Sequence, residues 1–239
     1  MRKFSSLRSL TLLALAISMA GRVLAGPVPA QPQAGGVSTL AKPAEIRIPT
    51  GPVRVLVQSP ADSVTDLQVI CLFQSTPSNT LHGSLIEING KLNGLLDRIR
   101  KPSMFRGELG ETMLIIPPAG SLNARKLLVI GLGDSETFTP QRMELVGSIL
   151  YGEANRLGVA HPFFAPTILD GGVTKFETGQ VSEHVVSGFL RGARTERALT
   201  DAGALHGQAI QDLTFLAGPA HATDTQRGIE RAIAADAIK

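Results

Sequence analysis

The chain alternates short apolar runs with longer segments in which apolar residues recur at helical spacing. The clearest such unit is residues 123–151, in which the run Lys126–Ile130 predicts a buried strand. The turn GLGD at residues 131–134 ends that run, because glycine frees the backbone for a tight turn. Thr139 and Pro140 then predict the start of an amphipathic helix. Strand, turn and helix together make half of an α/β unit.

The same pattern continues along most of the chain. Apolar runs predict strands at Val53–Val57, Leu67–Phe73, Thr112–Ile116 and Leu213–Leu216, and an irregular or edge strand within Val159–Leu169. Helical spacing predicts helices at Leu85–Ile99, Val181–Leu199 and Thr225–Ile238, the last capped by Thr223 or Asp224. The short connection between the first two strands predicts that they are neighbours, with one antiparallel pair. We therefore expect a three-layer α/β/α fold with a mixed, mostly parallel sheet.

The N-terminus has the features of a targeting segment. Basic residues precede the apolar run Leu10–Ala20, and Val23-Leu24-Ala25, which resembles a signal-peptidase site, follows it. The run is shorter than the roughly 20 residues that span a bilayer. We expect a signal peptide over residues 1–25, cleaved after Ala25, and export to the periplasm or the medium. Membrane contact is then confined to the signal during export, and a retained amphipathic anchor is the alternative.

Removing the signal changes both the domain plan and the charge. Residues 26–52 are rich in Pro, Gly and Ala and predict a flexible lead, so residues 53–239 form the single domain. Four of the 23 Lys/Arg and none of the 20 Asp/Glu lie in residues 1–25, which leaves 19 basic and 20 acidic side chains. A near-neutral chain without Trp and with one Tyr is a poor nucleic-acid binder. The basic stretch Arg98–Lys101 is expected to be a solvated helix end.

Candidate chemistry is sparse. No two of the five histidines are spaced i, i+4, and the carboxylates form no dense cluster, so neither a metal site nor a cofactor is predicted. A G-x-S-x-G motif is absent, and no catalytic residue is assigned. Cys71 lies in the apolar run Val69–Phe73, which favours a buried, inert thiol over a nucleophile.

Two pairs of glycines have a structural and a functional interpretation. Gly131 and Gly133, followed by Asp134, form a candidate ligand loop, since backbone N–H groups between a strand and a helix can hold a phosphate. The third glycine of a dinucleotide motif is missing and acidic residues follow, so a structural turn is favoured. Likewise Gly188 and Gly192 favour close helix packing over ligand contact.

The order of these pieces resembles the N-terminal domain of the leucyl (cytosol-type) aminopeptidase family over residues 53–239. The matching segments are Val69–Phe73, Phe105–Gly107 with Gly110–Thr112, Leu128–Gly133 with Phe138-Thr139, and Glu183–Arg197. The resemblance implies a macro-domain-like fold. It also implies that peptide hydrolysis belongs to a separate C-terminal domain with two divalent metals, whose signature Asn-Thr-Asp-Ala-Glu-Gly-Arg does not occur here. We expect this chain to lack that domain, so none of its residues inherits a catalytic or metal-binding role.

Three functions remain open on this basis. The first is a stand-alone exported domain that is non-catalytic by itself and acts in assembly, regulation or binding, as a homo-oligomer or with a partner peptidase. The second is a macro-domain-like binder of a small ligand such as a nucleotide or ADP-ribose. The third is an accessory part of a two-metal aminopeptidase whose catalytic residues come from another chain. An export signal is itself unexpected in a family whose full-length members are cytosolic.

Overall fold

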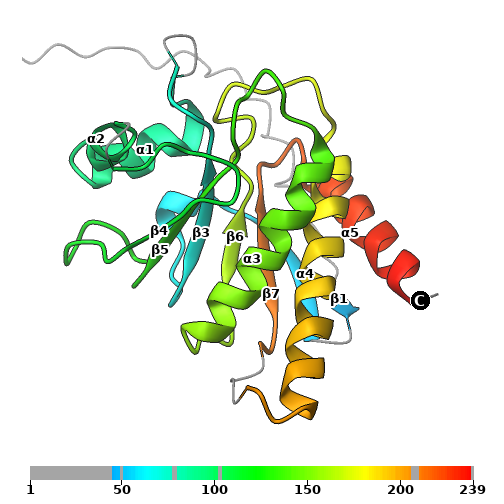
Figure 1. Ribbon diagram of the computed structural model, residues 1–239. Coiled ribbons are helices and arrows are strands. Elements are labelled where there is room, and N and C mark those ends of the chain that lie inside the picture. The colour runs from blue at the N-terminus through cyan, green and yellow to red at the C-terminus, as the bar shows by residue number, and fades with distance from the viewer. Residues whose placement is uncertain (1–44, 49–50, 77–79, 102–103, 206–209, 238–239) are drawn as a thin grey trace, which may run out of the picture. The chain divides into compact units, whose positions relative to one another are not determined.

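A computed structural model describes residues 45–48, 51–76, 80–101, 104–205 and 210–237 (Figure 1). The expected signal peptide, its cleavage site after Ala25 and most of the expected lead lie outside the described residues, and export stays a prediction. Within the described ranges, no helix combines the length and the apolar character needed to cross a membrane.

The described residues form a seven-stranded sheet in the order β1-β2-β7-β6-β3-β5-β4. The strands are β1 (Glu45–Ile48), β2 (Gly51–Val57), β3 (Gln68–Leu72), β4 (Thr112–Ile115), β5 (Leu127–Gly131), β6 (Phe163–Ala165) and β7 (Leu213–Ala217). The five inner strands are parallel, and the edge strands β1 and β4 are antiparallel to their neighbours. Every residue of β3 and β5 is buried, as expected for parallel strands covered on both faces. The mixed, mostly parallel sheet is confirmed.

The predicted pairing of the first two strands is wrong. β2 pairs with β1 and β7, while β3 pairs with β5 and β6, so two strands separate β2 from β3. The antiparallel neighbour of β2 is instead β1, which lies inside the segment expected to be a flexible lead. The alternation Glu-Ile-Arg-Ile is a strand pattern, which the Pro and Gly content around it obscured.

β6 also differs from its prediction. It has only three residues, which agrees with an irregular strand, but it lies in the middle of the sheet between β3 and β7. Pro162 and Pro166 flank the three residues, so neither proline interrupts the paired part of the strand. The strand predicted within Val159–Leu169 is therefore present, and the alternative of an edge position is wrong.

Helices cover both faces of the sheet and give the three expected layers (Figure 1). One core cluster joins the sheet to α1 (Gly83–Lys91) and α2 (Leu95–Ile99). The other joins the opposite face to α3 (Met143–Arg156), α4 (Thr178–Asp201) and α5 (Ala222–Asp236). Two short 3₁₀ turns, η1 (Pro60–Asp62) and η2 (Pro140–Arg142), complete the described elements. η2 begins after Thr139 and leads into α3, which agrees with the predicted helix start.

The segment expected as one helix over Leu85–Ile99 consists of two. Asn93 (φ 53°) and Gly94 (φ 76°) adopt the left-handed conformation, which ends α1 and reorients the chain before α2. At the end of α2, Arg100 is 8% exposed, so the solvated helix end expected there is buried at this position. Burial lowers the pKa of the Arg100 guanidinium, while the charge of Asp97 acts in the opposite direction.

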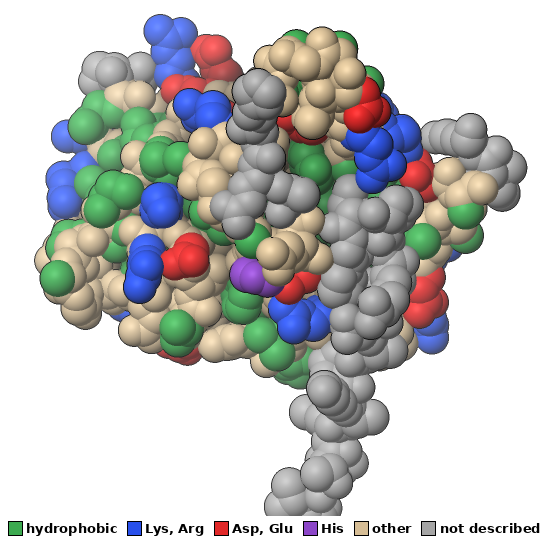
Figure 2. Space-filling view, turned by 90° about the horizontal axis from the view of Figure 1, so that it is seen from below, with side chains coloured by type: hydrophobic (Ala, Val, Ile, Leu, Met, Phe, Trp, Pro, Cys, Tyr) green, Lys and Arg blue, Asp and Glu red, His purple; other side chains and the backbone are tan. Residues whose placement is uncertain are grey.

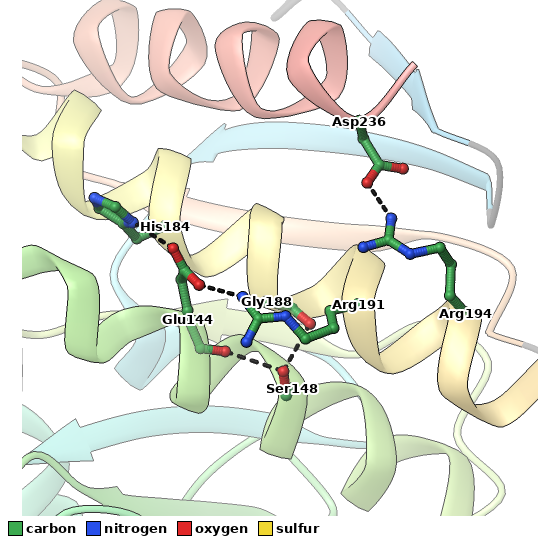
Figure 3. Close-up of polar contacts among 7 residues, drawn as sticks. All are labelled: Glu144, Ser148, His184, Gly188, Arg191, Arg194 and Asp236. Atoms are coloured by element: carbon green, nitrogen blue, oxygen red, sulfur yellow. Dashed lines mark hydrogen bonds and ion pairs between the residues drawn. The ribbon is translucent and has the colours of Figure 1, made fainter. Parts of the chain in front are cut away.

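Glycines bring α3 and α4 into direct backbone contact. A Cβ atom at Gly188 would lie 1.8 Å from the Glu144 carbonyl oxygen, and one at Gly147 would lie 1.9 Å from the Val185 carbonyl oxygen. Ser148 Oγ donates to the carbonyl oxygen of Gly188 at 2.9 Å across the same crossing (Figure 3). A Cβ atom at Gly192 would likewise lie 2.9 Å from Tyr151 Cβ. The predicted packing role of Gly188 and Gly192 is confirmed.

Polar side chains also link α3 and α4 at this crossing. Figure 3 shows Glu144 of α3 between His184 and Arg191 of α4, with His184 Nδ1 at 3.0 Å from Glu144 Oε1. Burial raises the pKa of the Glu144 carboxyl, but hydrogen bonds and charge from His184 and Arg191 outweigh it and hold that pKa below its ordinary value. The crossing fixes the position of α4, whose first residues line the cleft described next.

Candidate ligand cleft

A cleft of about 600 Å³ opens at the carboxyl ends of β2, β7 and β6. Its lining includes the residues that follow these strands and the first residues of α1, α4 and α5. The carboxyl ends of these parallel strands meet the N-termini of α4 and α5, which follow β6 and β7, and the N-terminus of α1, which follows β3. Open α/β sheets bind their ligands at this edge. The volume falls in the range of roughly 300–1,000 Å³ typical of small-molecule sites.

Most of the cleft wall is apolar. Ile168, Phe176, Val181 and Phe215 contribute hydrophobic side chains from the β6–α4 loop, from α4 and from β7. Three of them, Ile168, Val181 and Phe215, are also members of the main core cluster, so this part of the wall is continuous with the packed interior. The arrangement offers an apolar molecule a preformed surface.

The β6–α4 loop is held in place through Thr167. Its Oγ1 accepts a hydrogen bond from the Cys71 N–H at 3.0 Å and donates one to the Cys71 carbonyl oxygen at 2.7 Å. Thr167 therefore satisfies the β3 backbone where β6 has already turned away after Pro166. Its φ of 49° is unusual for a β-branched residue, and such strain persists only where surrounding contacts impose it.

Two carboxylates from different elements give the cleft its acidic end. Asp170, in the β6–α4 loop, accepts a hydrogen bond from the Ser84 hydroxyl in the first turn of α1, and its carbonyl oxygen accepts from the His82 N–H at 2.8 Å. Glu87, one turn further along α1, accepts from the Ser59 hydroxyl at 2.6 Å. All of these side chains except His82 line the cleft.

The N-terminus of α4 is capped by a side chain from another helix. Asp224 Oδ2 accepts hydrogen bonds from the Gly179 N–H at 2.6 Å and from Thr178 Oγ1 at 3.0 Å. Asp224 was predicted to cap its own helix, but α5 begins at Ala222 after His221, so Asp224 lies inside the first turn of α5. Its carboxylate therefore stabilises two helix ends that meet beside the cleft.

The candidate ligand loop lies away from this cleft and its amides are used within the protein. The N–H groups of Gly131, Leu132 and Gly133 donate to the carbonyl oxygens of Glu111, Leu72 and Gly107 at 2.7, 2.9 and 2.8 Å. Asp134 Oδ1 accepts from the Glu136 N–H at 3.0 Å. A ligand role for Gly131, Gly133 and Asp134 stays a prediction, and in the described conformation these groups hold the turn together.

Other candidate chemistry is placed as follows. Cys71 is fully buried and unpaired with another cysteine, and burial raises the pKa of its thiol far above the usual range. No group of three or more His, Cys, Asp and Glu residues among the described residues is arranged to hold a metal ion. His206 lies outside the described residues. Cys71 therefore carries no reactive thiolate at neutral pH.

A smaller hollow of about 320 Å³ lies at the opposite, amino-terminal ends of β3, β5 and β6. Its lining includes Asp66, Arg125 and His161. Beside it, Asp212 accepts from Arg54 at 3.0 Å and lies 2.6 Å from His161 Nδ1.

On the face seen in Figure 2, Lys and Arg side chains are interspersed with Asp and Glu side chains. A polyanion-binding surface needs clustered positive charge. The expectation of no nucleic-acid partner agrees with this face and stays a prediction.

Sequence reasoning did not find the cleft. Its acidic residues and their serine partners are far apart in the chain, since Asp170 and Ser84 are separated by 86 positions. No site was predicted at residues 170–172, and Glu87 was predicted only as part of the helix Leu85–Ile99. The one local signal was the placement of Ser84 near the start of a predicted helix, which does not reveal a partner in a distant loop.

Comparison with known proteins identifies the family. The family model described as "Cytosol aminopeptidase family, N-terminal domain" matches residues 69–193. A probable cytosol aminopeptidase of Thermosynechococcus vestitus is 30% identical over 41% of this chain and 20% of its own length. A probable cytosol aminopeptidase of Sulfurihydrogenibium sp. is 26% identical over 54% of this chain and 24% of its own length. The chain thus matches about a quarter or less of either relative.

Solved structures agree on the fold. A tomato leucine aminopeptidase mutant superimposes with a TM-score of 0.56 at 20% identity, over 83% of this chain and 38% of that one. The Oceanobacillus iheyensis macrodomain with MES bound superimposes with a TM-score of 0.56 at 12% identity, over 80% and 97% of the two chains. The macro-domain-like fold is confirmed. With the family description matched over more than half of its residues, the chain belongs to the cytosol aminopeptidase family and contains the N-terminal domain of that family.

Proposed function

We propose that this domain is a non-catalytic binding module that takes up a small, predominantly apolar ligand in the cleft at the carboxyl edge of its sheet. The cleft of about 600 Å³ at the ends of β2, β7 and β6 is the observation that carries this proposal. Its position follows the general rule for open α/β sheets, and its wall is continuous with the packed core. A preformed apolar wall binds a ligand without the cost of ordering a loop.

Macrodomains of the same fold support a binding role for this domain. One Oceanobacillus iheyensis macrodomain structure contains ADP and superimposes with a TM-score of 0.54 at 13% identity. That likeness concerns the fold, so it supports the presence of a ligand site and leaves the identity of the ligand to the residues that line the cleft.

A neutral apolar probe tests the proposal. We expect 1-hexanol to bind the full-length protein with a dissociation constant of about 1 mM, since small ligands gain at most roughly 0.3–1.5 kcal/mol per heavy atom. Isothermal titration calorimetry measures the affinity. Ala217→Trp, at the end of β7 in the cleft lining, is expected to abolish binding because the indole fills the cleft.

Ala235→Trp provides the matched control. Ala235 is exposed on α5, outside the cleft lining, so the same substitution there is expected to leave hexanol affinity unchanged. Equal loss of binding in both variants, or no binding by the wild-type protein, would contradict a binding role for this cleft.

A second candidate is an accessory role beside a catalytic chain. The relatives named above are probable aminopeptidases about four to five times longer than the matched segments, which favours association of such a domain with a peptidase part. β4 is an outer strand of the sheet formed by the described residues, and Leu114 in it and Ile116 just after it are exposed at 41% and 66%. Sheet edges of this kind pair with other chains.

The accessory role predicts an inactive but associating protein. Purified full-length chain with added Mn²⁺ or Zn²⁺ is expected to release no leucine from a leucyl peptide, and light scattering is expected to show self-association that Ile116→Lys weakens. Val64→Lys serves as the control, since Val64 lies in the β2–β3 connection and is exposed at 75%. Hydrolysis by the chain alone would refute the non-catalytic proposal, and a monomer at all concentrations would refute self-association.

A further inference from the structure

We propose that the cleft selects small apolar molecules that carry a primary ammonium group, which donates hydrogen bonds to the Glu87 and Asp170 carboxylates. This inference rests on the proposed function, since it names the ligand class of the same cleft. The apolar wall formed by residues such as Ile168 and Phe215 accommodates the body of the ligand, and the acidic end accommodates its charge.

The helix ends around the cleft would by themselves favour an anion. Three helices, α1, α4 and α5, begin at the cleft, and each N-terminus carries about half a positive charge. Two of these ends are already bound by carboxylates of the protein. Asp170 accepts from Ser84 at the start of α1, and Asp224 accepts from Gly179 at the start of α4. Since each ionised carboxylate contributes a full negative charge, the two ends are more than neutralised.

Glu87 makes the balance more negative. Among the described residues that line the cleft, Glu87 and Asp170 are acidic and none is Lys or Arg. Lys91, one turn after Glu87 on α1, donates to the Asp62 carboxylate at 2.7 Å and to the Ala61 carbonyl oxygen at 2.9 Å. That cation is held at η1, outside the lining. A phosphate or carboxylate ligand therefore meets no Lys or Arg side chain among these residues, where His221 is the remaining basic side chain, whereas an ammonium group meets two carboxylates.

Both carboxylates keep capacity for a ligand. An ionised carboxylate has about four acceptor positions on its two oxygens. The Ser59 hydroxyl occupies one position on Glu87, at 2.6 Å, and the Ser84 hydroxyl occupies one on Asp170. These serine contacts also orient the carboxylates, which lowers the cost of ordering them when a cation binds. Hydrogen bonds between an ammonium and a carboxylate are about twice as strong as neutral ones.

Three probes with one hydrocarbon body separate charge from apolar contact. We expect calorimetric titration of the full-length protein at pH 7 and low salt to rank hexylamine first, 1-hexanol second and hexanoate last. Hexylamine should bind roughly tenfold more tightly than hexanol, as charge-assisted hydrogen bonds imply. That advantage should shrink as salt is raised, because Glu87 is exposed at the rim.

Charge-removing variants test the assignment to these two residues. Glu87→Gln and Asp170→Asn keep the side-chain shape, and each is expected to remove most of the hexylamine advantage while hexanol affinity stays the same. Glu230→Gln, at an exposed position on α5 outside the lining, is the control and should keep the wild-type ranking. Melting temperatures measured in parallel separate a change in binding from loss of fold in Asp170→Asn.

The outcomes distinguish this inference from the function on which it rests. If hexanol binds but hexylamine binds no more tightly, or if hexanoate binds best, the ammonium preference is wrong while the proposed binding role still holds. If the hexylamine advantage persists in the Glu87→Gln, Asp170→Asn double variant, the assignment to these carboxylates is wrong. If none of the hexyl probes binds, both proposals fail.

Discussion

Replacing Gly188 by Ala is expected to lower the stability of the domain by about 3 kcal/mol, despite the higher helix propensity of alanine. The added methyl group would lie 1.8 Å from the Glu144 carbonyl oxygen, so α3 and α4 must separate. Separation breaks the Ser148 hydrogen bond to the Gly188 carbonyl oxygen and loosens the Glu144 contacts with His184 and Arg191 (Figure 3). Thermal unfolding should show a melting temperature lower by roughly 6–12 °C for a domain of this size.

Gly152→Ala provides a control with the opposite sign. Gly152 lies in the interior of α3, and a Cβ atom there would meet nothing within 4 Å. Alanine at such a position removes conformational freedom from the unfolded chain and should stabilise the domain by up to about 1 kcal/mol. A Gly188→Ala protein as stable as the Gly152→Ala protein would show that the helices do not cross as closely as described.

The sequence predicted elements better than it predicted their arrangement. β3, β5 and β7 were found because each is a short run of apolar residues that the fold buries on both faces. The neighbours of β2 were not, because β7, the strand that pairs with it in parallel, begins at Leu213, more than 150 residues later. No local pattern carries that information. The break between α1 and α2 was a different kind of miss, since Asn93-Gly94 is a local signal that the strong helical spacing overrode.

For the candidate sites too, local features could be predicted from the sequence, whereas contacts between distant segments could not. Gly131-Leu132-Gly133 drew attention because glycines after a strand are visible locally, and Gly188 with Gly192 because they are four residues apart on one helix. The carboxylates of the cleft are meaningful only in the folded chain. Asp170 contacts the start of α1 and Asp224 contacts the start of α4, so each acts on a helix other than the one beside it in sequence. A side chain that caps a helix from a distant segment has no characteristic spacing from that helix in the sequence.

The turn after β5 gives the second large expected effect, and it decides between the two interpretations of that turn. In Gly131→Ala, the Cβ atom would lie 2.0 Å from the Glu108 carbonyl oxygen, and the two hydrogen bonds that Gly131 makes with Glu111 and Gly110 would be strained. We expect a loss of about 3 kcal/mol in the free energy of unfolding, measured by urea denaturation. Gly218→Ala is the matched control: Gly218 directly follows β7 at the same edge, and its Cβ would come no closer than 3.7 Å, to His221 Cδ2. That variant should keep its stability within about 1 kcal/mol.

A Gly131→Ala protein that is as stable as Gly218→Ala but loses affinity for an anionic ligand would instead assign the turn to binding. The close approach of the 107–110 segment makes the first result the expected one, because the volume that a phosphate would need beside Gly131 is already occupied by backbone.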